Sequence, residues 1–257
     1  GVVAIIISGI MLKKTKLFAG EATPFVMELP EYHMPTVKSV LLSMWERVKG
    51  YIIKAGTIIF LSTIVIWFLM NFGDAGDGFG LLDADAPDYM DYSLMAGLGN
   101  LLAWIFAPLG FDTWQATATT ITALVAKENV VATVGIITQL SSYGESDPAL
   151  WLGFGQMIGG GAAAISAFCA FNLLCAPCFA AMGAIRQQQA SAKWFWITIG
   201  YLCGFAWCVG LMIYQFVGLA TGEIGFNFWT IIAIAVAAAM LFQIFRPMPK
   251  HKNEQTK

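Results

Sequence analysis

Long stretches with almost no charged side chains dominate this chain of 257 residues and restrict the folds open to it. Hydrophobic residues make up 58% of the sequence and charged residues only 12%, whereas a soluble domain contains about 25% charged residues. A transmembrane helix needs about 20 mainly apolar residues. The sequence therefore predicts an all-α fold, a polytopic transmembrane helical bundle with discontinuous helices and one interfacial amphipathic helix. Its expected spans cover residues 52–72, 93–109, 114–140, 151–185, 194–218 and 227–245.

Charge and length divide the chain into four parts. Residues 1–12 are apolar but too short to cross a bilayer, so we interpret them as the end of a truncated transmembrane span in a C-terminal piece of a longer membrane protein. Residues 13–50 are expected to form a cytoplasmic connector that ends in an amphipathic helix at the membrane interface, over residues 36–49. Residues 51–245 form the transmembrane domain, and residues 246–257 form a basic cytoplasmic tail.

The distribution of lysine and arginine predicts the orientation of these spans. Basic residues gather in residues 13–49, at Arg186 and Lys193, and in the tail, whereas the acidic loop 73–91 contains neither lysine nor arginine. Cytoplasmic loops are enriched in both residue types. Three crossings between Asp91 and Arg186, followed by two more, bring every basic segment to the cytoplasmic side. The net charge of -2 gives no reason to expect a nucleic-acid partner.

Two cysteines flank a proline in the long apolar stretch, in the order Cys175-Ala176-Pro177-Cys178. Pro177 has no amide hydrogen and clashes with the carbonyl four residues back, so the oxygen of Leu173 should lose its helical partner. Polar groups inside a membrane are functional candidates by default, and thiolates suit a borderline-soft ion such as Fe²⁺. Taken alone, the motif is more often a kink between two small apolar side chains. A thiol–disulfide role would lack the βαβ surroundings of thioredoxin-like motifs.

Further donors share a helix face with the first cysteine. A regular helix would place Cys178 about 60° away from Cys175 and would align an amide, a thiol, a phenyl ring and a thioether on one stripe: Asn172, Cys175, Phe179 and Met182. The sequence predicts a cation site built from Cys178, Cys175, Met182 and Asn172.

An ionisable pair, Lys127-Glu128, lies in the middle of the apolar stretch 114–140. Neighbouring residues on a helix point about 100° apart, so a direct ion pair between them is poor. We expect Glu128 to face a cation path and Lys127 to reach a carbonyl or another carboxylate. The alternative is a short re-entrant or interfacial helix on which both charges are solvated.

Glycines and the remaining cysteines give weaker signals. The triplet at residues 159–161 can interrupt a helix, and discontinuous helices build many transporter sites. The first glycine of the triplet also follows Gly155 at the spacing that favours close helix packing, and we favour packing. Cys203 and Cys208 are interpreted as core residues, and Cys169 as a weak candidate that faces away from the CxxC pair.

Four segments together resemble the second half of ferrous iron transport protein B. They are residues 28–35 (ELPEYHMP), 54–59 (KAGTII), 126–131 (AKENVV) and 176–186 (APCFAAMGAIR). The resemblance covers nearly all of residues 1–250. It implies a bacterial inner-membrane protein for Fe²⁺ uptake, with a cytosolic GTPase domain at the N-terminus and two repeated gate regions similar to nucleoside-transporter gates. It also implies that Cys178 is the gate cysteine.

The resemblance further implies which partners and cofactors to expect. No GxxxxGK[ST] phosphate loop occurs in the sequence, so GTP and Mg²⁺ are expected only in a missing N-terminal domain, and this chain is not expected to be an enzyme. The implied partners are Fe²⁺ as transported substrate, the lipid bilayer, the missing GTPase domain and first gate half, small cytosolic Feo proteins and further copies in an oligomer. The expected metal ligands are Cys178, Cys175, Glu128, Met182 and Asn172, with no cofactor in this chain and a cytoplasmic C-terminus.

Other functions fit parts of the sequence. A nucleoside- or small-solute-type transporter with the same gate architecture would need aromatic and amide side chains around a larger cavity, which Trp104, Trp114 and Asn172 could provide. A membrane thiol oxidoreductase would need Cys175 and Cys178 to cycle between dithiol and disulfide. A membrane-anchored scaffold is disfavoured, because an anchor gains nothing from costly buried polar groups.

Overall fold

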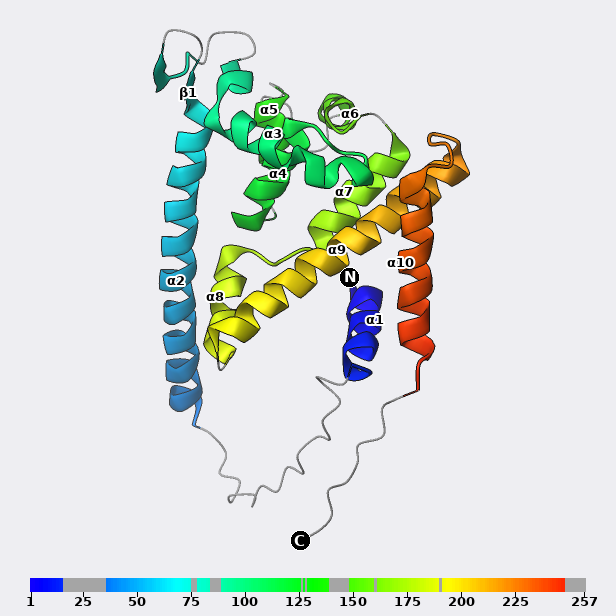
Figure 1. Cartoon of the computed structure of the whole chain (residues 1–257). Coiled ribbons are helices and arrows are strands. Elements are labelled where there is room, and N and C mark those ends of the chain that lie inside the picture. The colour runs from blue at the N-terminus through cyan, green and yellow to red at the C-terminus, as the bar shows by residue number, and fades with distance from the viewer. Residues whose placement is uncertain are drawn as a thin grey trace. The chain divides into compact units, whose positions relative to one another are not determined.

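The computed structural model of the chain is mostly helical, which confirms the predicted fold class (Figure 1). It describes residues 1–15, 36–74, 78–83, 89–125, 127, 129–138, 148–159, 161–189 and 191–247. The chain forms two compact units: Gly1–Ile53 with Ile234–Lys257, and Lys54–Ala233. Each unit is described by itself below.

Ten α-helices, two short 3-10 helices and one small hairpin make up the described residues. The first part of the chain contains α1 (Val2–Lys13), α2 (Val37–Asn71), β1 (Phe72–Asp74), β2 (Phe79–Leu81), η1 (Tyr89–Tyr92), α3 (Leu94–Phe106) and η2 (Ala107–Leu109). The second part contains α4 (Trp114–Val125), α5 (Asn129–Ile137), α6 (Pro148–Met157), α7 (Ala162–Leu174), α8 (Phe179–Gln188), α9 (Ala192–Thr221) and α10 (Phe228–Phe245). The strands β1 and β2 pair antiparallel.

In the first unit, α1 lies against the end of α10. The ammonium of Lys14 donates a hydrogen bond to the carbonyl of Ile244, and the side-chain amide of Gln243 donates to the carbonyl of Met11 at 3.3 Å. A cation at a helix C-terminus meets carbonyls that have no partner within the helix. The two helices are therefore joined by polar contacts at the end of α10.

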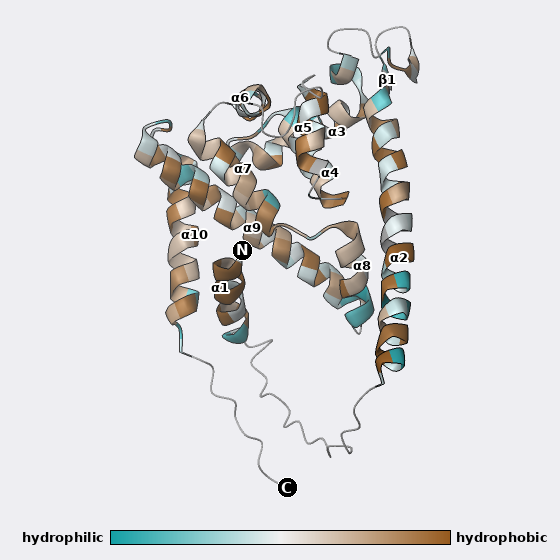
Figure 2. Cartoon of the chain, turned by 180° about the vertical axis from the view of Figure 1, so that it is seen from behind, coloured by the Kyte–Doolittle hydropathy of each residue, from teal (hydrophilic) through white to brown (hydrophobic). Residues whose placement is uncertain are grey.

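Several helices are long and apolar enough to cross a membrane. Ala162–Gln188, which comprises α7 and α8, Ala192–Thr221 and Phe228–Phe245 meet this requirement among the described residues. A fourth candidate is the pair Leu94–Leu109 and Trp114–Val125, which is bent by 98° and is either a broken span or a re-entrant loop. Apolar residues extend along α9 and α10 (Figure 2), as a lipid environment requires.

Two of the predicted apolar spans are divided into separate helices, as the predicted discontinuous helices require. Residues 114–140 contain α4 and α5, and residues 151–185 contain most of α6, all of α7 and most of α8. α6 ends at Met157, and Gly159, which follows it, has a φ of +98°, which a residue with a side chain rarely adopts. Gly155 and Gly159 therefore do not lie on one regular helix, and the prediction that favoured close packing of this pair is wrong.

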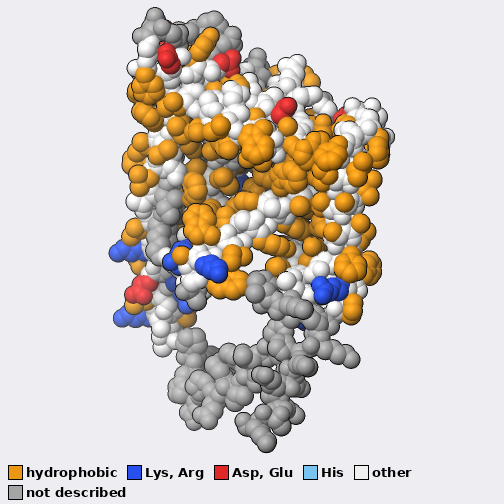
Figure 3. All heavy atoms as spheres, in the orientation of Figure 1, with side chains coloured by type: hydrophobic (Ala, Val, Ile, Leu, Met, Phe, Trp, Pro, Cys, Tyr) orange, Lys and Arg blue, Asp and Glu red, His pale blue; other side chains and the backbone are white. Residues whose placement is uncertain are grey.

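These breaks change the predicted number of crossings. Between Asp91 and Arg186 the described residues contain at most two candidate spans, the bent pair and Ala162–Gln188, rather than three. α5 and α6, with 9 and 10 residues, are too short to cross a bilayer. If the bent pair is a re-entrant loop, Ala162–Gln188 is the single crossing between Asp91 and Arg186 among the described residues. One crossing, like three, places these two residues on opposite sides of the membrane, so the predicted orientation is unchanged. Within the second unit, acidic side chains gather at the upper end of the molecule, away from the α8–α9 junction with its basic residues (Figure 3).

The predicted interfacial helix is not a separate element. Residues 37–49 form the first part of α2, which continues without interruption to Asn71. Thirty-five residues of α-helix extend for about 52 Å, well beyond the roughly 30 Å of a hydrocarbon core. Apolar periodicity therefore indicated the correct type of structure there but not its length.

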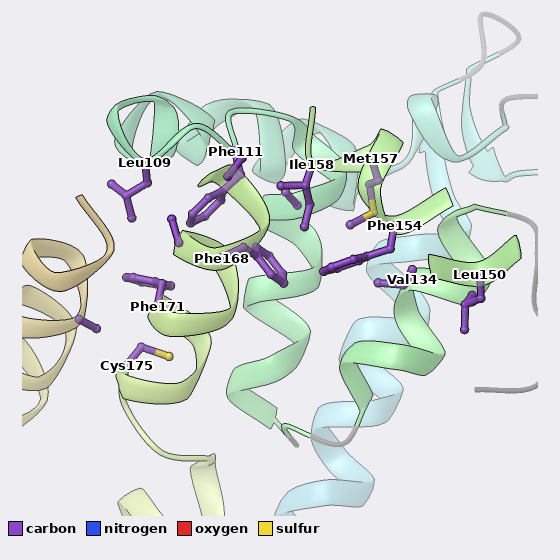
Figure 4. Packing of buried hydrophobic residues seen from close by; sticks show 14 residues of the cluster. Leu109, Phe111, Val134, Leu150, Phe154, Met157, Ile158, Phe168, Phe171 and Cys175 are labelled. Carbon is purple, nitrogen blue, oxygen red and sulfur yellow. The ribbon is translucent and has the colours of Figure 1, made fainter. Parts of the chain in front are cut away.

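The core of the second unit surrounds α7 (Figure 4). Phe168 is 1% exposed and packs edge-to-face against Phe111 and Phe154, with ring centroids 5.3 and 5.5 Å apart. Phe171 meets Phe106 in the same way at 5.2 Å. The opposite side of α7 packs along α9. α7 is therefore packed on several sides, and it begins at Ala162 and ends at Leu174.

Candidate functional site

The CxxC segment separates two helices. α7 ends at Leu174, and α8 begins at Phe179. Cys175 and Cys178 both have extended backbone conformations, with ψ angles of 175° and 158°. Pro177 lacks an N–H, clashes with the carbonyl four residues back and disfavours the helical conformation of the residue before it, which accounts for the break. The four side chains expected on one stripe therefore do not share a helix face, and that prediction is wrong.

The predicted sulfur ligands lie on the two sides of the break. Cys175 follows the last turn of α7, beyond Phe171, and is only 5% exposed (Figure 4). Its Sγ lies 3.6 Å from the carbonyl oxygen of Asn172. Cys178 is half-buried and precedes the first turn of α8, where its carbonyl accepts the backbone N–H of Met182 at 2.9 Å. Met182 therefore lies one turn into α8.

Asn172 contributes a buried oxygen that no described residue satisfies. The residue is 9% exposed, and its side-chain NH₂ donates to the carbonyl of Phe168 at 3.0 Å. Its Oδ1 has no hydrogen-bond partner among the described residues. Buried polar atoms are nearly always paired, so an unpaired acceptor beside a broken helix indicates a place for a donor or a cation.

Lys127 reaches the same helix end from the α4–α5 junction. Its Nζ donates hydrogen bonds to the carbonyl oxygens of Asn172 and Leu173, at 2.8 and 3.2 Å. The expectation that Lys127 reaches a carbonyl is confirmed. The Leu173 oxygen is the one that Pro177 deprives of a helical partner. An ammonium group at a helix C-terminus also complements the negative end of the helix dipole.

Glu128, the acidic member of the predicted site, lies outside the described residues. Among the residues that are described, no three or more His, Cys, Asp or Glu side chains gather into a group able to hold a metal ion. The described candidates are therefore Cys175, Cys178, Met182 and Asn172.

A cavity of about 310 Å³ opens beside the broken helix, between α4, α5, α6 and α7. Apolar side chains form most of its wall, and Lys127 and Asn172 provide the polar part. Trp151 and Cys169 also line it. The sequence made Cys169 only a weak candidate. Helical spacing indicates that Cys169 faces away from Cys175, but it does not indicate that a cavity lies on that side of α7.

The two tryptophans expected to line a larger cavity lie elsewhere. Trp104 is 72% exposed on α3, and the indole N–H of Trp114 donates to the carboxylate of Asp91 at 2.8 Å. Neither residue lines the cavity. That part of the small-solute hypothesis is wrong.

A carboxylate caps the opposite end of α7. The two oxygens of Glu223 accept the backbone N–H groups of Ala162 and Ala163, at 3.1 and 3.2 Å. Gly161 permits this approach, because a Cβ there would lie 2.7 Å from Glu223 Oε2. The sequence contained no signal for this contact, since Glu223 follows Ala162 by 61 residues.

Buried threonines line α4. Thr117, Thr119 and Thr120 are at most 5% exposed. Their hydroxyls donate to backbone carbonyls four residues earlier in the chain. The hydroxyl of Thr133 donates to that of Thr122 at 3.1 Å and joins α5 to α4. These groups satisfy each other and the backbone within an apolar setting.

Comparisons with known proteins agree on one family. Residues 1–47 match the family described as ferrous iron transport protein B C terminus, and residues 52–191 match the family described as nucleoside recognition. The chain is 32% identical to a fusion of Fe(2+) transport protein A and Fe(2+) transporter FeoB from Porphyromonas gingivalis, with 84% of this chain and 29% of that protein covered. It is 32% identical to the Fe(2+) transporter FeoB of Staphylococcus aureus, with 84% and 30% covered.

The Fe(2+) transporter FeoB of Escherichia coli is 28% identical over 95% of this chain and 36% of its own length. The chain thus spans about a third of the length of the curated relatives that it matches. No solved structure matches.

Proposed function

The chain belongs to the ferrous iron transport protein B family, as part of its C-terminal gate region, and on that premise we propose that it forms one half of a permease for Fe²⁺ uptake. The observation that carries this proposal is the helix break at Cys175–Cys178, with a buried thiol and an unsatisfied amide oxygen beside it. Discontinuous helices commonly form the ion sites of transporters, because their ends expose backbone groups inside the protein.

The ligands proposed for Fe²⁺ in transit are Cys178, Cys175, Met182, Asn172 and Glu128. Thiolate, thioether and oxygen donors together suit a borderline-soft divalent ion that must also be able to leave. The structure supports part of this set, since Cys175 lies next to the Asn172 carbonyl and Cys178 follows it across the break.

The proposed setting is the bacterial inner membrane, with the C-terminus of the chain in the cytoplasm. A GTPase domain at the N-terminus of the complete protein, which binds GTP and Mg²⁺, would couple GTP hydrolysis to opening of the path. The first gate half would complete that path, and small cytosolic Feo proteins would bind on the cytoplasmic side.

A second candidate is transport of a nucleoside or another small solute. The description of the family matched by residues 52–191 and the 310 Å³ cavity favour it. Ligand sites for small molecules begin at about this volume and carry several convergent polar groups. The polar side chains in the cavity wall are those of Lys127 and Asn172, and the rest of the wall is largely apolar. A hydroxyl-rich sugar would find too few hydrogen-bond partners there. Fe²⁺ is therefore the better-supported substrate.

Replacement of the gate thiol tests the iron path. Cys178→Ser keeps the size of the side chain but exchanges a soft sulfur for a hydroxyl that stays protonated near neutral pH. In cells without other ferrous importers, we expect Cys178→Ser and Cys175→Ser to reduce Fe²⁺ uptake strongly and Mn²⁺ uptake less, because Mn²⁺ prefers oxygen ligands. Cys208→Ser, a half-buried thiol of α9, is the matched control and should leave uptake unchanged.

Equal Fe²⁺ uptake by the wild type and a variant with both Cys175 and Cys178 replaced by serine, at matched expression, would contradict the sulfur ligands. The oxidoreductase alternative makes a different prediction, since both cysteines would then alternate between free thiols and a disulfide during turnover.

A further inference from the structure

The broken end of α7 forms a cradle of oxygen atoms that attracts cations. The last carbonyls of a helix have no partner within it, and together they carry the negative end of the helix dipole. Here Pro177 removes the amide that would have continued the ladder to Leu173. The extended backbone at Cys175 turns the chain away before another turn can form.

Residues 172–175 carry two further donor atoms. The Oδ1 of Asn172 is buried and unpaired among the described residues, and the Sγ of Cys175 lies 3.6 Å from the Asn172 carbonyl. Two backbone oxygens, an amide oxygen and a sulfur thus come from three residues of this four-residue stretch. This mixture of donors is chemically suited to a divalent transition-metal ion.

The cradle already holds a cation. The Lys127 ammonium lies 2.8 Å from the Asn172 oxygen and 3.2 Å from the Leu173 oxygen, where it makes two charge-assisted hydrogen bonds. Lys127 comes from the junction between α4 and α5, so it is independent of the helix that it caps. A metal ion cannot occupy the same carbonyl oxygens while the ammonium remains, because both groups are positive and the surroundings are apolar.

We propose that Lys127 is a resident cation of the transport path, and that a transported divalent ion binds at the end of α7 by displacing the Lys127 ammonium from the carbonyls of Asn172 and Leu173. The proposal rests on the proposed function. It assigns Lys127 a role in release as well as in binding. A divalent ion that must first displace the Lys127 ammonium binds more weakly than it would bind to the same oxygen atoms without the lysine. When the ammonium returns to the carbonyls of Asn172 and Leu173, it helps to expel the ion. Conduction requires this balance between entry and exit.

The experiment measures Fe²⁺ binding to the purified full-length transporter in lipid nanodiscs under anaerobic conditions, by calorimetry. Lys127→Met removes the competing charge, and Lys127→Gln removes the charge but keeps an N–H donor for the carbonyls. Both variants should bind Fe²⁺ roughly tenfold to a hundredfold more tightly than the wild type, the range that corresponds to loss of a charge-assisted hydrogen bond. Lys127→Arg should not tighten binding. Lys193→Met, at an exposed lysine in the first turn of α9, should match the wild type.

Uptake into proteoliposomes separates competition from a purely structural role of the lysine. Competition predicts that Lys127→Gln lowers both KM and the maximal rate, because the ion enters more easily but leaves more slowly. A lysine that only caps α7 would, when replaced, lower the rate without lowering KM.

Two outcomes would overturn the proposal, and they are distinguishable. If the wild type binds Fe²⁺ and the folded Lys127→Gln protein binds it equally or more weakly, displacement is wrong while the iron function stands. If neither protein binds Fe²⁺, the proposed function fails and the displacement proposal fails with it. Should Lys127→Met fail to fold, Lys127→Gln decides between these outcomes alone, since its amide can still cap the Leu173 carbonyl.

Discussion

Removal of the Glu223 carboxylate should loosen the first turn of α7. Its two oxygens accept the N–H groups of Ala162 and Ala163 at 3.1 and 3.2 Å, and the residue before the helix, Gly161, has no side chain with which to replace them. Glu223→Ala therefore leaves two helix-terminal donors without their side-chain acceptor. Because α7 carries Asn172 in its last turn, this change also tests how firmly the site is held.

The size of the effect follows from the contacts. Loss of a side-chain cap costs about 1 kcal/mol, and loss of an anion at a helix N-terminus costs about 0.3–1 kcal/mol more. Glu223 is exposed, so solvent screening reduces the effect to about the lower end of the summed range or slightly below it. We expect a loss of about 1–1.5 kcal/mol in local stability, which corresponds to opening of the first turn roughly five to twelve times more often.

Hydrogen exchange of the full-length protein in nanodiscs measures this opening directly. Peptides that contain residues 162–168 should exchange faster in Glu223→Ala, and Glu223→Gln, which keeps one acceptor oxygen but no charge, should lie between Glu223→Ala and the wild type. Asp112→Asn is the matched control, because Asp112 is also exposed and acidic, whereas the N–H groups of Ala162 and Ala163 bond to Glu223. An unchanged exchange rate in Glu223→Ala would show that the carboxylate does not cap α7.

Three further changes test other parts of the second unit. Phe168→Ala should lower the free energy of unfolding by at least about 2 kcal/mol, because two edge-to-face ring contacts are lost next to an existing cavity; an unchanged melting temperature in detergent would contradict the described core. Thr230→Val should cost about 1–3 kcal/mol, because the buried Gln215 oxygen loses the hydroxyl that donates to it at 2.9 Å, whereas Thr230→Ser should retain wild-type stability; equal melting temperatures for both variants would argue against the bond. Gln188→Cys should react with a membrane-impermeant reagent only after the cytoplasmic side is exposed, and labelling in intact cells would reverse the predicted sidedness.

The sequence predicted the fold class well because that prediction depends on composition. An apolar stretch must be helical in a bilayer, where every backbone group needs an internal partner. The breaks were harder to predict. Hydropathy does not distinguish a continuous span from α6, α7 and α8 in succession, because the glycines and the proline that divide them are tolerated in many continuous transmembrane helices.

The same limit applies to the candidate site. The chemistry of Pro177 correctly indicated that the Leu173 oxygen would lack a helical partner, and the cost of a buried charge correctly indicated that Lys127 would reach a carbonyl. That these two groups find each other depends on the packing of α4 against neighbouring helices, which no local pattern contains. The stripe of Asn172, Cys175 and Met182 failed for a related reason, since it assumed a regular helix through a proline that ends one.

α7 is fixed at both ends by charges that match its dipole. The Glu223 carboxylate lies at its positive N-terminus, and the Lys127 ammonium lies at its negative C-terminus. Neither charge belongs to α7: Glu223 follows α9, and Lys127 joins α4 to α5. The position of the carbonyls beside Cys175 is therefore set by two other parts of the same unit. Displacement of Lys127 by a divalent ion would replace one cation with another at the C-terminus and leave the Glu223 cap intact, so α7 itself need not unwind. The group that must move is the lysine at the α4–α5 junction, and there we expect binding of the ion to be coupled to a change in shape.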